Sequence, residues 1–330
     1  MSDEPELRSG PPWAMEEMIR AEAGLPEAVA QNDDGQRLAA RIADAEAVLF
    51  TGCGTSEHAA RAAHAIVRES FPDAVLDVRD AFEARLAPPE RGLVVGFSHE
   101  AGTQSTLAAL QGAVDKGAEA VLVTAHPERV ADGIDAVATP LHDRSWCHTV
   151  AYASPLLVHA LFAGLTVERA TALIERALDA GAPDVAPLAG CRRLLVVGSG
   201  VDEITASELA LKLEEATFVP TTPLGAEKVL HGHLPAADEH TGLILLRYDP
   251  DHGEQRDQRS ANVAAAAAVL GMPTVALGAE VTTRTEALLA GALGLQLLTL
   301  ELCMALGTNP DLIRRDEPLY RQAAEAASVG

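Results

Sequence analysis

The feature that most constrains the fold is a unit that occurs twice: a continuous apolar strand that ends in glycine and leads into a helical pattern. The first copy is residues 47–52 (AVLFTG) with a helix over 57–69, and the second is residues 194–198 (LLVVG) with a helix through Glu215. Strands that are apolar on both faces belong in a parallel sheet covered by helices on both sides. The repetition predicts an internal duplication of one doubly wound α/β unit, with ligand sites at the carboxyl ends of the strands.

Further segments extend both copies. We predict strands over 93–98, 120–124, 243–248 and 274–278, and helices over 13–31, 103–116, 149–178, 255–270 and 286–306. The stretch 181–190 is rich in Ala, Pro and Gly and is the predicted boundary. We therefore expect a disordered tail over 1–12, a first domain with a leading helix over 13–180, and a second domain with a polar tail over 190–330.

Charge and composition exclude several classes of function. The net charge of −23 and pI of about 4.8 exclude a non-specific nucleic-acid binder or an anionic-membrane binder, both of which need a basic face. Aromatic residues make up 3% of the chain, which disfavours a base-stacking surface. A local pocket for a small anion is still compatible with this charge.

The four cysteines show no CxxC spacing, so the sequence predicts neither a disulfide framework nor a zinc site, and we expect no metal and no cofactor. A reduced, cytoplasmic location follows as the default. The longest apolar stretch, 287–307, contains Gln296 and Glu301, which favours a buried helix of a soluble protein over a membrane span.

Two strand-to-helix turns are rich in hydroxyl groups. The first is Cys53-Gly54-Thr55-Ser56, and the second runs from Ser98 through Thr103 to Thr106. Backbone N–H groups and hydroxyls at a helix N-terminus stabilise an anion, so the two turns together could hold one phosphate. The alternative is that these residues only cap helices. Glu100, within the second turn, opposes a phosphate unless it points away or is protonated.

Glu208, Lys212 and Glu215 share one face of a predicted helix, at positions i, i+4 and i+7. Two carboxylates around a lysine provide a base and an electrophilic partner for proton abstraction next to a carbonyl. From spacing alone, a solvated salt-bridge stripe is the favoured alternative. His231, which precedes Gly232, is a further candidate acid or base near neutral pH.

In chain order these motifs are Cys-Gly-Thr-Ser at 53–56, Ser-x-x-x-x-Thr-x-x-Thr from 98, Gly-x-x-x-Asp from 198, Glu-x-Ala-Leu-Lys-x-x-Glu from 208 and His-Gly at 231. The combination resembles the sugar isomerase (SIS) domain proteins, and it is most similar to the isomerase half of glucosamine-6-phosphate synthase and its stand-alone relatives. The resemblance extends from Met15 to about Arg315. It implies two tandem SIS-type subdomains with flavodoxin-like sheets.

The resemblance also implies roles for matched residues. Thr55, Ser56, Ser98 and Thr103 would hold the sugar phosphate. Glu215 would move a proton between C1 and C2, Lys212 would assist it, and Glu208 would line the same pocket. His231 would open the sugar ring from the neighbouring subunit of a homodimer. The implied partner is a small sugar or sugar phosphate.

Departures from the family pattern change the expected chemistry. His99 and Glu100 replace the Gln-Ser of the family's phosphate loop, and His148 stands in the sugar loop. The family's terminal lysine is missing, and no segment resembles the glutaminase half, so we expect no glutamine-dependent ammonia transfer. The prediction is an aldose–ketose type isomerase of a phosphosugar or amino-sugar phosphate. A fructosyl-amine-6-phosphate deglycase or amino-sugar deaminase, and a non-catalytic sugar-phosphate-binding protein, are the alternatives.

Overall fold

The computed structural model describes residues 8–327 and contains two sheets. The first sheet has the strands β1 (Val48–Gly52), β2 (Leu76–Asp80), β3 (Leu93–Phe97), β4 (Glu119–Thr124) and β5 (Asp135–Ala138), and the second has β6 (Arg193–Gly198), β7 (Thr221–Gly225), β8 (Thr241–Arg247) and β9 (Thr274–Gly278). The strand orders are β2-β1-β3-β4-β5 and β7-β6-β8-β9, and all neighbours pair in parallel. The orders correspond over four strands and are flavodoxin-like, which confirms the predicted fold class.

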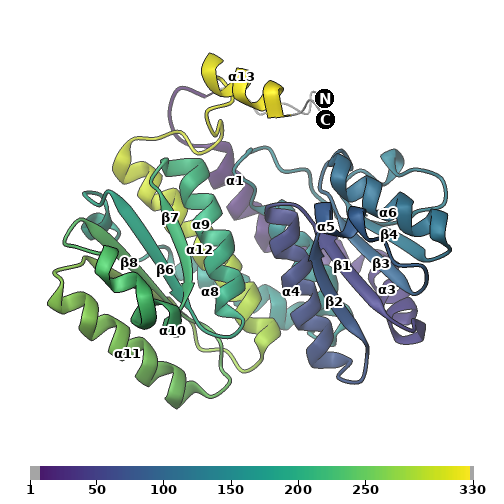
Figure 1. The fold of residues 1–330 in the computed structure, drawn as a ribbon, viewed down its shortest axis with the longest axis horizontal. Coiled ribbons are helices and arrows are strands. Elements are labelled where there is room, and N and C mark those ends of the chain that lie inside the picture. Colours follow the sequence, from purple (N-terminus) through teal and green to yellow (C-terminus); the bar gives the residue numbers. More distant parts are fainter. Residues whose placement is uncertain (1–7, 328–330) are drawn as a thin grey trace.

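Helices cover both faces of each sheet (Figure 1). The first half contains α1 (Ala14–Ala21), α2 (Leu25–Ala30), α3 (Asp34–Asp44), α4 (Thr55–Ser70), α5 (Ala81–Leu86), α6 (Gln104–Lys116), α7 (Val150–Phe162) and α8 (Val167–Ala180). The second half contains α9 (Asp202–Thr217), α10 (Ala226–Lys228), α11 (Gly253–Val269), α12 (Arg284–Leu306) and α13 (Pro318–Ala327).

A central helical layer joins the two sheets. Successive strand residues point to opposite faces, and the inward residues Phe50 of β1 and Val196 of β6 belong to one continuous core with α4, α7, α9 and α12. The outward residues Leu49 and Leu195 belong to separate cores under α6 and α11. Because both sheets share the central layer, α4 of the first half packs directly against α9 of the second.

Both halves place the helix N-terminus tightly against the end of their first strand. A Cβ atom on Gly52 would lie 2.5 Å from the backbone of Ser56, and one on Gly198 would collide in the same way with the backbone of Asp202. Only a residue without a side chain permits this approach. The glycine that ends each predicted strand is thus required by the turn, in the same way in both copies.

Several predicted elements differ from those in the structure. The single helix expected over 149–178 is two helices, α7 and α8, because Gly164 has a φ of +103° and Thr166 starts a new helix by accepting a hydrogen bond from Arg169 N. The strands β2, β5 and β7 were not predicted. They lie at sheet edges and lack a continuous apolar run.

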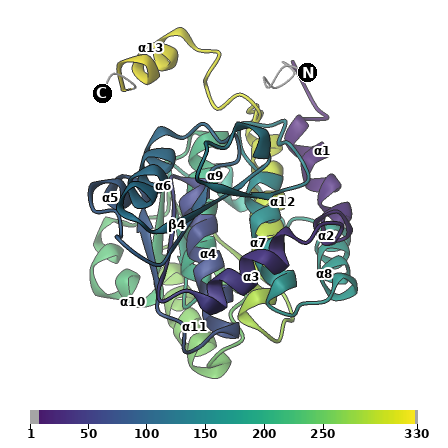
Figure 2. The ribbon, with the colours of Figure 1, turned by 90° about the vertical axis from the view of Figure 1, so that its right-hand side faces the viewer.

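The two ends of the chain are only partly described. Residues 1–7 of the predicted disordered tail lie outside the described residues; of the rest, Arg8 forms an ion pair with Glu17 at 2.8 Å. The expected polar C-terminal tail contains the unpredicted helix α13, which has no buried residue and stands clear of the body in Figure 2.

Among the described helices, α12 alone is long and apolar enough to cross a membrane by length and composition. Most of its residues are buried in the central layer, against α9, α8 and α7. Burial inside the molecule accounts for its hydrophobicity, as the sequence predicted for residues 287–307.

Candidate functional site

Three charged residues of α9 form a cluster inside the molecule. Glu208 and Lys212 are fully buried, whereas the Glu215 side chain is 23% exposed. Lys212 Nζ lies 2.6 Å from Glu215 Oε2 and 3.6 Å from Glu208 Oε1. The alternative prediction of a solvated salt-bridge stripe is therefore wrong. We call Glu208, Lys212 and Glu215 the α9 triad.

The first turn of α4 holds the Glu208 carboxylate from the other half of the molecule. The Thr55 hydroxyl donates to Glu208 Oε1 at 3.1 Å, and His58 Nδ1 lies 2.6 Å from Glu208 Oε2. Thr55 thus contacts the triad directly. His58 was missed by sequence reasoning, although its place one turn after Thr55 on the same helix was a usable signal. The triad therefore joins the two halves at their shared helical layer.

Burial and opposite charges set the protonation of the triad. Burial disfavours the Lys212 ammonium, but the carboxylates of Glu208 and Glu215 outweigh it and raise the pKa of Lys212. Burial would raise the pKa of Glu208, but Lys212 and His58 lower it below its ordinary value. For Glu215 burial outweighs Lys212, so its pKa is raised. A partly exposed carboxyl with a raised pKa beside a fixed cation is typical of a general base.

The loop after β5 contacts the triad from the first half. The Cys147 thiol donates to the carbonyl oxygen of Lys212 at 3.8 Å. Asp143 fixes this loop, because its carboxylate accepts hydrogen bonds from the backbone N–H groups of Ser145, Thr149 and Ala151. His148 follows on the same loop. Burial, and then the charge of Lys212, lower the pKa of His148 well below its usual range, so its imidazole is neutral at pH 7.

The second hydroxyl turn lies at the same edge of the first sheet as Thr55 and Ser56, since β1 and β3 are neighbours. Ser98 Oγ lies 3.1 Å from Thr103 Oγ1 and accepts a hydrogen bond from Thr103 N at 3.4 Å. Ser56 is half-buried at the start of α4. The two turns therefore bring their hydroxyl groups to one end of the sheet, as the motif spacing predicted.

His99 and Glu100, the two residues of the second hydroxyl turn that were predicted to depart from the resembled pattern, have different surroundings. His99 is buried, and its Nε2 accepts a hydrogen bond from Asp143 N at 2.9 Å; burial lowers the pKa of His99 to about 4. His99 thus anchors the loop that carries His148. Glu100 is 41% exposed and turns its Oε2 toward His126 Nε2, at 3.0 Å, and Arg129, at 3.5 Å.

His231 belongs to a different element from the α9 triad, the short segment 229–233 that follows α10. Its side chain is 75% exposed, and its Nε2 is 3.1 Å from Glu227 Oε2. The backbone around it, 229–233, is kinked at His231 and Gly232. The structure contains one chain, so the predicted contribution of His231 to a partner's site stays a prediction.

The tail before α13 returns to the site and carries an arginine that sequence reasoning did not assign. Asp311 accepts hydrogen bonds from Ala14 N and Met15 N, at 2.7 and 2.8 Å, and so caps α1. The Arg315 guanidinium lies 4.7 Å from the centre of the Trp146 ring. Its charge also lowers the pKa of His148, after the larger effects of burial, Lys212 and His99. Arg315 is therefore a basic group close to the triad.

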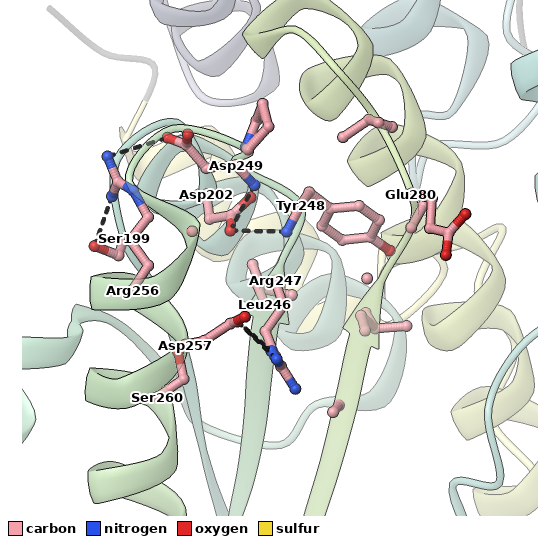
Figure 3. A pocket seen from close by; sticks show the side chains of 17 residues that line it. Ser199, Asp202, Leu246, Arg247, Tyr248, Asp249, Arg256, Asp257, Ser260 and Glu280 are labelled. Carbon is pink, nitrogen blue, oxygen red and sulfur yellow. Dashed lines mark hydrogen bonds and ion pairs between the residues drawn. The ribbon is translucent and has the colours of Figure 1, made fainter.

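A separate cavity of about 800 Å³ lies at the carboxyl end of the second sheet (Figure 3). Its lining includes Ser199 and Asp202 of the predicted Gly-x-x-x-Asp motif, together with Asp249 and Arg256. Asp202 Oδ2 accepts hydrogen bonds from Tyr248 N and Asp249 N, whereas its buried Oδ1 has no hydrogen-bond partner. None of the predicted catalytic residues lines this cavity.

No family model matches the chain. The isomerizing glutamine–fructose-6-phosphate aminotransferase of Caulobacter vibrioides is 28% identical over 233 residues, which cover 62% of this chain and 38% of the relative. The chain thus matches well under half the length of that protein.

Two solved structures have the same fold. The C-terminal domain of glucosamine-fructose-6-phosphate aminotransferase from Francisella tularensis superposes with a TM-score of 0.76 at 19% identity, covering 93% of this chain and 99% of that one. The tagatose-6-phosphate ketose/aldose isomerase of Escherichia coli gives a TM-score of 0.72 at 18% identity, covering 91% and 95%. The chain therefore has the fold of the SIS phosphosugar isomerases and is a sequence relative of the isomerizing aminotransferases, as its motifs indicated.

Proposed function

We propose that this protein is a phosphosugar or amino-sugar-phosphate isomerase that moves a proton between C1 and C2. The observation that carries the proposal is Glu215: it is the one partly exposed member of a buried triad, its pKa is raised, and it contacts Lys212 at 2.6 Å. A base with these properties can take a proton next to a carbonyl and return it to the neighbouring carbon.

The triad supplies the charges that this reaction needs. The Glu215 carboxylate removes the proton from C2 of an open-chain aldose, which gives an enediolate. After the O2 proton has moved to O1, the protonated Glu215 returns its proton to C1 and the ketose forms. Lys212 stays protonated and offsets the negative charge that develops on the oxygens. Glu208, held by Thr55 and His58, keeps Lys212 in place. The neutral imidazole of His148 is a candidate hydrogen-bond partner for sugar hydroxyls.

The remaining predicted residues complete the proposed site. Ser56, Ser98 and Thr103 would bind the phosphate at the end of the first sheet, with Arg315 as a nearby positive charge. In a homodimer, the exposed His231 of a partner subunit would transfer the proton at the ring oxygen. The sequence relatives and the fold neighbours include isomerizing aminotransferases and a ketose/aldose isomerase, which favours this reaction class.

The test is hydrogen–deuterium exchange at C2 of glucose 6-phosphate and glucosamine 6-phosphate in D₂O, followed by NMR. Glu215→Gln should slow the exchange by about 10²- to 10⁴-fold while leaving ligand binding largely intact. The matched control is Glu203→Gln, an exposed carboxylate of the same helix that pairs with Lys228 at 3.8 Å and should exchange like the wild type. Unchanged exchange in Glu215→Gln would remove Glu215 as the base.

Product analysis separates the alternatives. A deglycase would release the amine from a fructosyl-amine 6-phosphate, and a deaminase would release ammonia from an amino-sugar phosphate. A sugar-phosphate-binding protein without activity would bind these ligands and catalyse neither exchange nor release.

A further inference from the structure

A second group of titratable side chains lies outside the α9 triad, on three neighbouring strand ends of the first sheet. Glu100 follows β3, His126 follows β4 and His142 follows β5. One ligand atom from each, a carboxylate oxygen or an imidazole nitrogen, lies within 4.8 Å of the other two. From this geometry we infer that Glu100, His126 and His142 form a binding site for a first-row divalent metal ion such as Zn²⁺.

The distances suit a metal centre. Metal–ligand bonds of about 2.1 Å in tetrahedral geometry place ligand atoms about 3.4 Å apart. Glu100 Oε2 lies 3.0 Å from His126 Nε2, and the rings of His126 and His142 have centroids 4.1 Å apart. Small side-chain rotations therefore suffice to bring three ligand atoms around one ion. Two imidazoles with one carboxylate is a donor set that suits zinc, iron and related metals, and it leaves one or more positions for water or a ligand.

The surroundings of His126 provide independent support. Its side chain is 5% exposed, and its Nδ1 lies 2.9 Å from Glu128 Oε1. A metal-bound histidine commonly directs its other ring nitrogen at a carboxylate in this way, which fixes the tautomer and the ring orientation. The Nε2 atom, which points toward Glu100, is buried and makes no hydrogen bond of good geometry. The orientation of His126 thus leaves the correct nitrogen for a metal.

Hydrogen bonds between the strand ends hold the ligands in register. Thr124 Oγ1 donates to the carbonyl oxygen of His99 at 2.9 Å and accepts from His126 N at 3.1 Å. His142 is exposed and can adjust. Arg129 lies 3.5 Å from Glu100 Oε2 and is 40% exposed, so a metal ion would compete with this guanidinium for the carboxylate. His99 is not a ligand, because its Nε2 already accepts the Asp143 N–H.

The experiment is titration of the purified full chain, treated with chelator and dialysed, with Zn²⁺ by calorimetry and with Co²⁺ by visible absorption. One Zn²⁺ should bind per chain, and Co²⁺ should give the absorption bands of a site with nitrogen ligands. His142→Ala, at an exposed position that does not endanger folding, should weaken binding by at least tenfold, as should Glu100→Gln. Glu128→Gln should weaken it by about 10- to 100-fold through the orientation of His126. Affinity should fall as the pH is lowered, because protons compete with the metal ion for its ligand atoms.

His240→Ala is the control. It removes an exposed histidine directly before β8, at the amino end of the second sheet, and should bind Zn²⁺ like the wild type. Absence of stoichiometric binding to the wild type would overturn the inference. So would binding that His142→Ala and Glu100→Gln leave unchanged, since the metal would then lie elsewhere. Both readouts are independent of any isomerase activity.

Discussion

The carboxyl ends of the two sheets have the same backbone but opposite chemistry. After Gly52 and Gly198 the chain turns in the same way, and the glycines two residues further, Gly54 and Gly200, have φ values of +57° and +65°. The next positions carry hydroxyls, Thr55 and Ser56, in the first half. In the second half they carry Val201 and the buried Asp202.

The duplicated fold therefore determines where a ligand site can form, but the side chains at each sheet end determine what the site can bind. The first sheet end combines hydroxyl groups, imidazoles and the α9 triad. The cavity at the second sheet end combines buried carboxylates with the guanidinium of Arg256, and Asp202 there has an oxygen without a hydrogen-bond partner. The phosphate that we propose for the first sheet end would meet hydroxyl groups there, whereas at the second sheet end it would meet the buried carboxylates of Asp202 and Asp249.

The largest loss of stability should come from removing Lys212, the central cation of the α9 triad. Lys212→Met leaves Glu208 and Glu215 buried without their shared counter-charge and should lower the free energy of unfolding by about 3–5 kcal/mol. Arg256→Met in the second site should cost at most about 2 kcal/mol, because the Asp249 carboxylate keeps hydrogen bonds from Val201 N and Asp251 N. Urea denaturation measures both.

Two controls define the Lys212 result. Lys116→Met removes an exposed ion pair with Glu90, at 3.6 Å, and should change stability by less than about 0.5 kcal/mol. Adding Glu208→Gln to Lys212→Met should restore part of the loss. Equal losses for Lys212→Met and Arg256→Met would contradict the proposed difference between the two sites.

The next effect is a pH dependence of protein stability that comes from Asp202, in the cavity at the end of the second sheet. Burial, together with the charge of Asp249, raises the pKa of Asp202 from 3.8 to about 6. Between these values the folded protein binds more protons than the unfolded chain, so stability falls as pH rises from 4 through 6 and levels off near pH 7. The Asp202→Asn variant has no carboxyl group at this position, so its stability does not fall with pH in this way. The stability of Asp202→Asn relative to the wild type should therefore increase by about 2 kcal/mol from pH 4 to pH 7.

Urea denaturation at pH 4, 5, 6 and 7 measures that increase. Ser56→Ala, at the equivalent position of the first half, should show a stability difference that does not vary with pH. If the stability difference between Asp202→Asn and the wild type did not vary with pH, the pKa of Asp202 would not be raised by folding.

The third effect is a loss of stability on replacing the glycine that ends the first strand of each half, and it should be equal in the two halves. Gly52→Ala and Gly198→Ala each place a methyl group against the backbone of the following helix and should each destabilise by about 1–3 kcal/mol. Gly24→Ala, where no atom lies within 4 Å of the new methyl group and φ is −90°, is the control and should be nearly neutral. Thermal unfolding of the three variants compares them. A large inequality between Gly52→Ala and Gly198→Ala would break the equivalence of the two turns.

The sequence predicted the parts of this fold that depend on local pattern. The central strands β1, β3, β4, β6 and β8 have continuous apolar runs because helices cover both of their faces. The edge strands β2 (LDVRD) and β7 (TTPLG) are half-exposed or contain proline, so their sequences carry no such signal. Their pairing depends on the neighbouring strand.

The sequence predicted which residues belong to the candidate site, but it did not predict that they are buried. The spacing of Glu208, Lys212 and Glu215 placed them on one helix face, but not inside the molecule. Their burial depends on α4, whose Thr55 and His58 lie about 150 residues earlier in the chain. The position of Arg315 likewise depends on a tail that returns to α1. Contacts of this length have no local pattern to reveal them.

The smallest effect concerns the charge of Glu100 in the first site. A carboxylate that faced a bound phosphate would weaken its binding strongly, but Glu100 turns its Oε2 toward His126 and Arg129. With metal removed by chelator, Glu100→Ser should therefore change the affinity for fructose 6-phosphate by less than about threefold, or about 0.6 kcal/mol. Ser98→Ala, which removes a hydroxyl of the proposed phosphate loop, is the comparison and should weaken binding more. A gain of tenfold or more in Glu100→Ser would show that this carboxylate faces the anion, and the two sheet ends would then both be acidic toward their ligands.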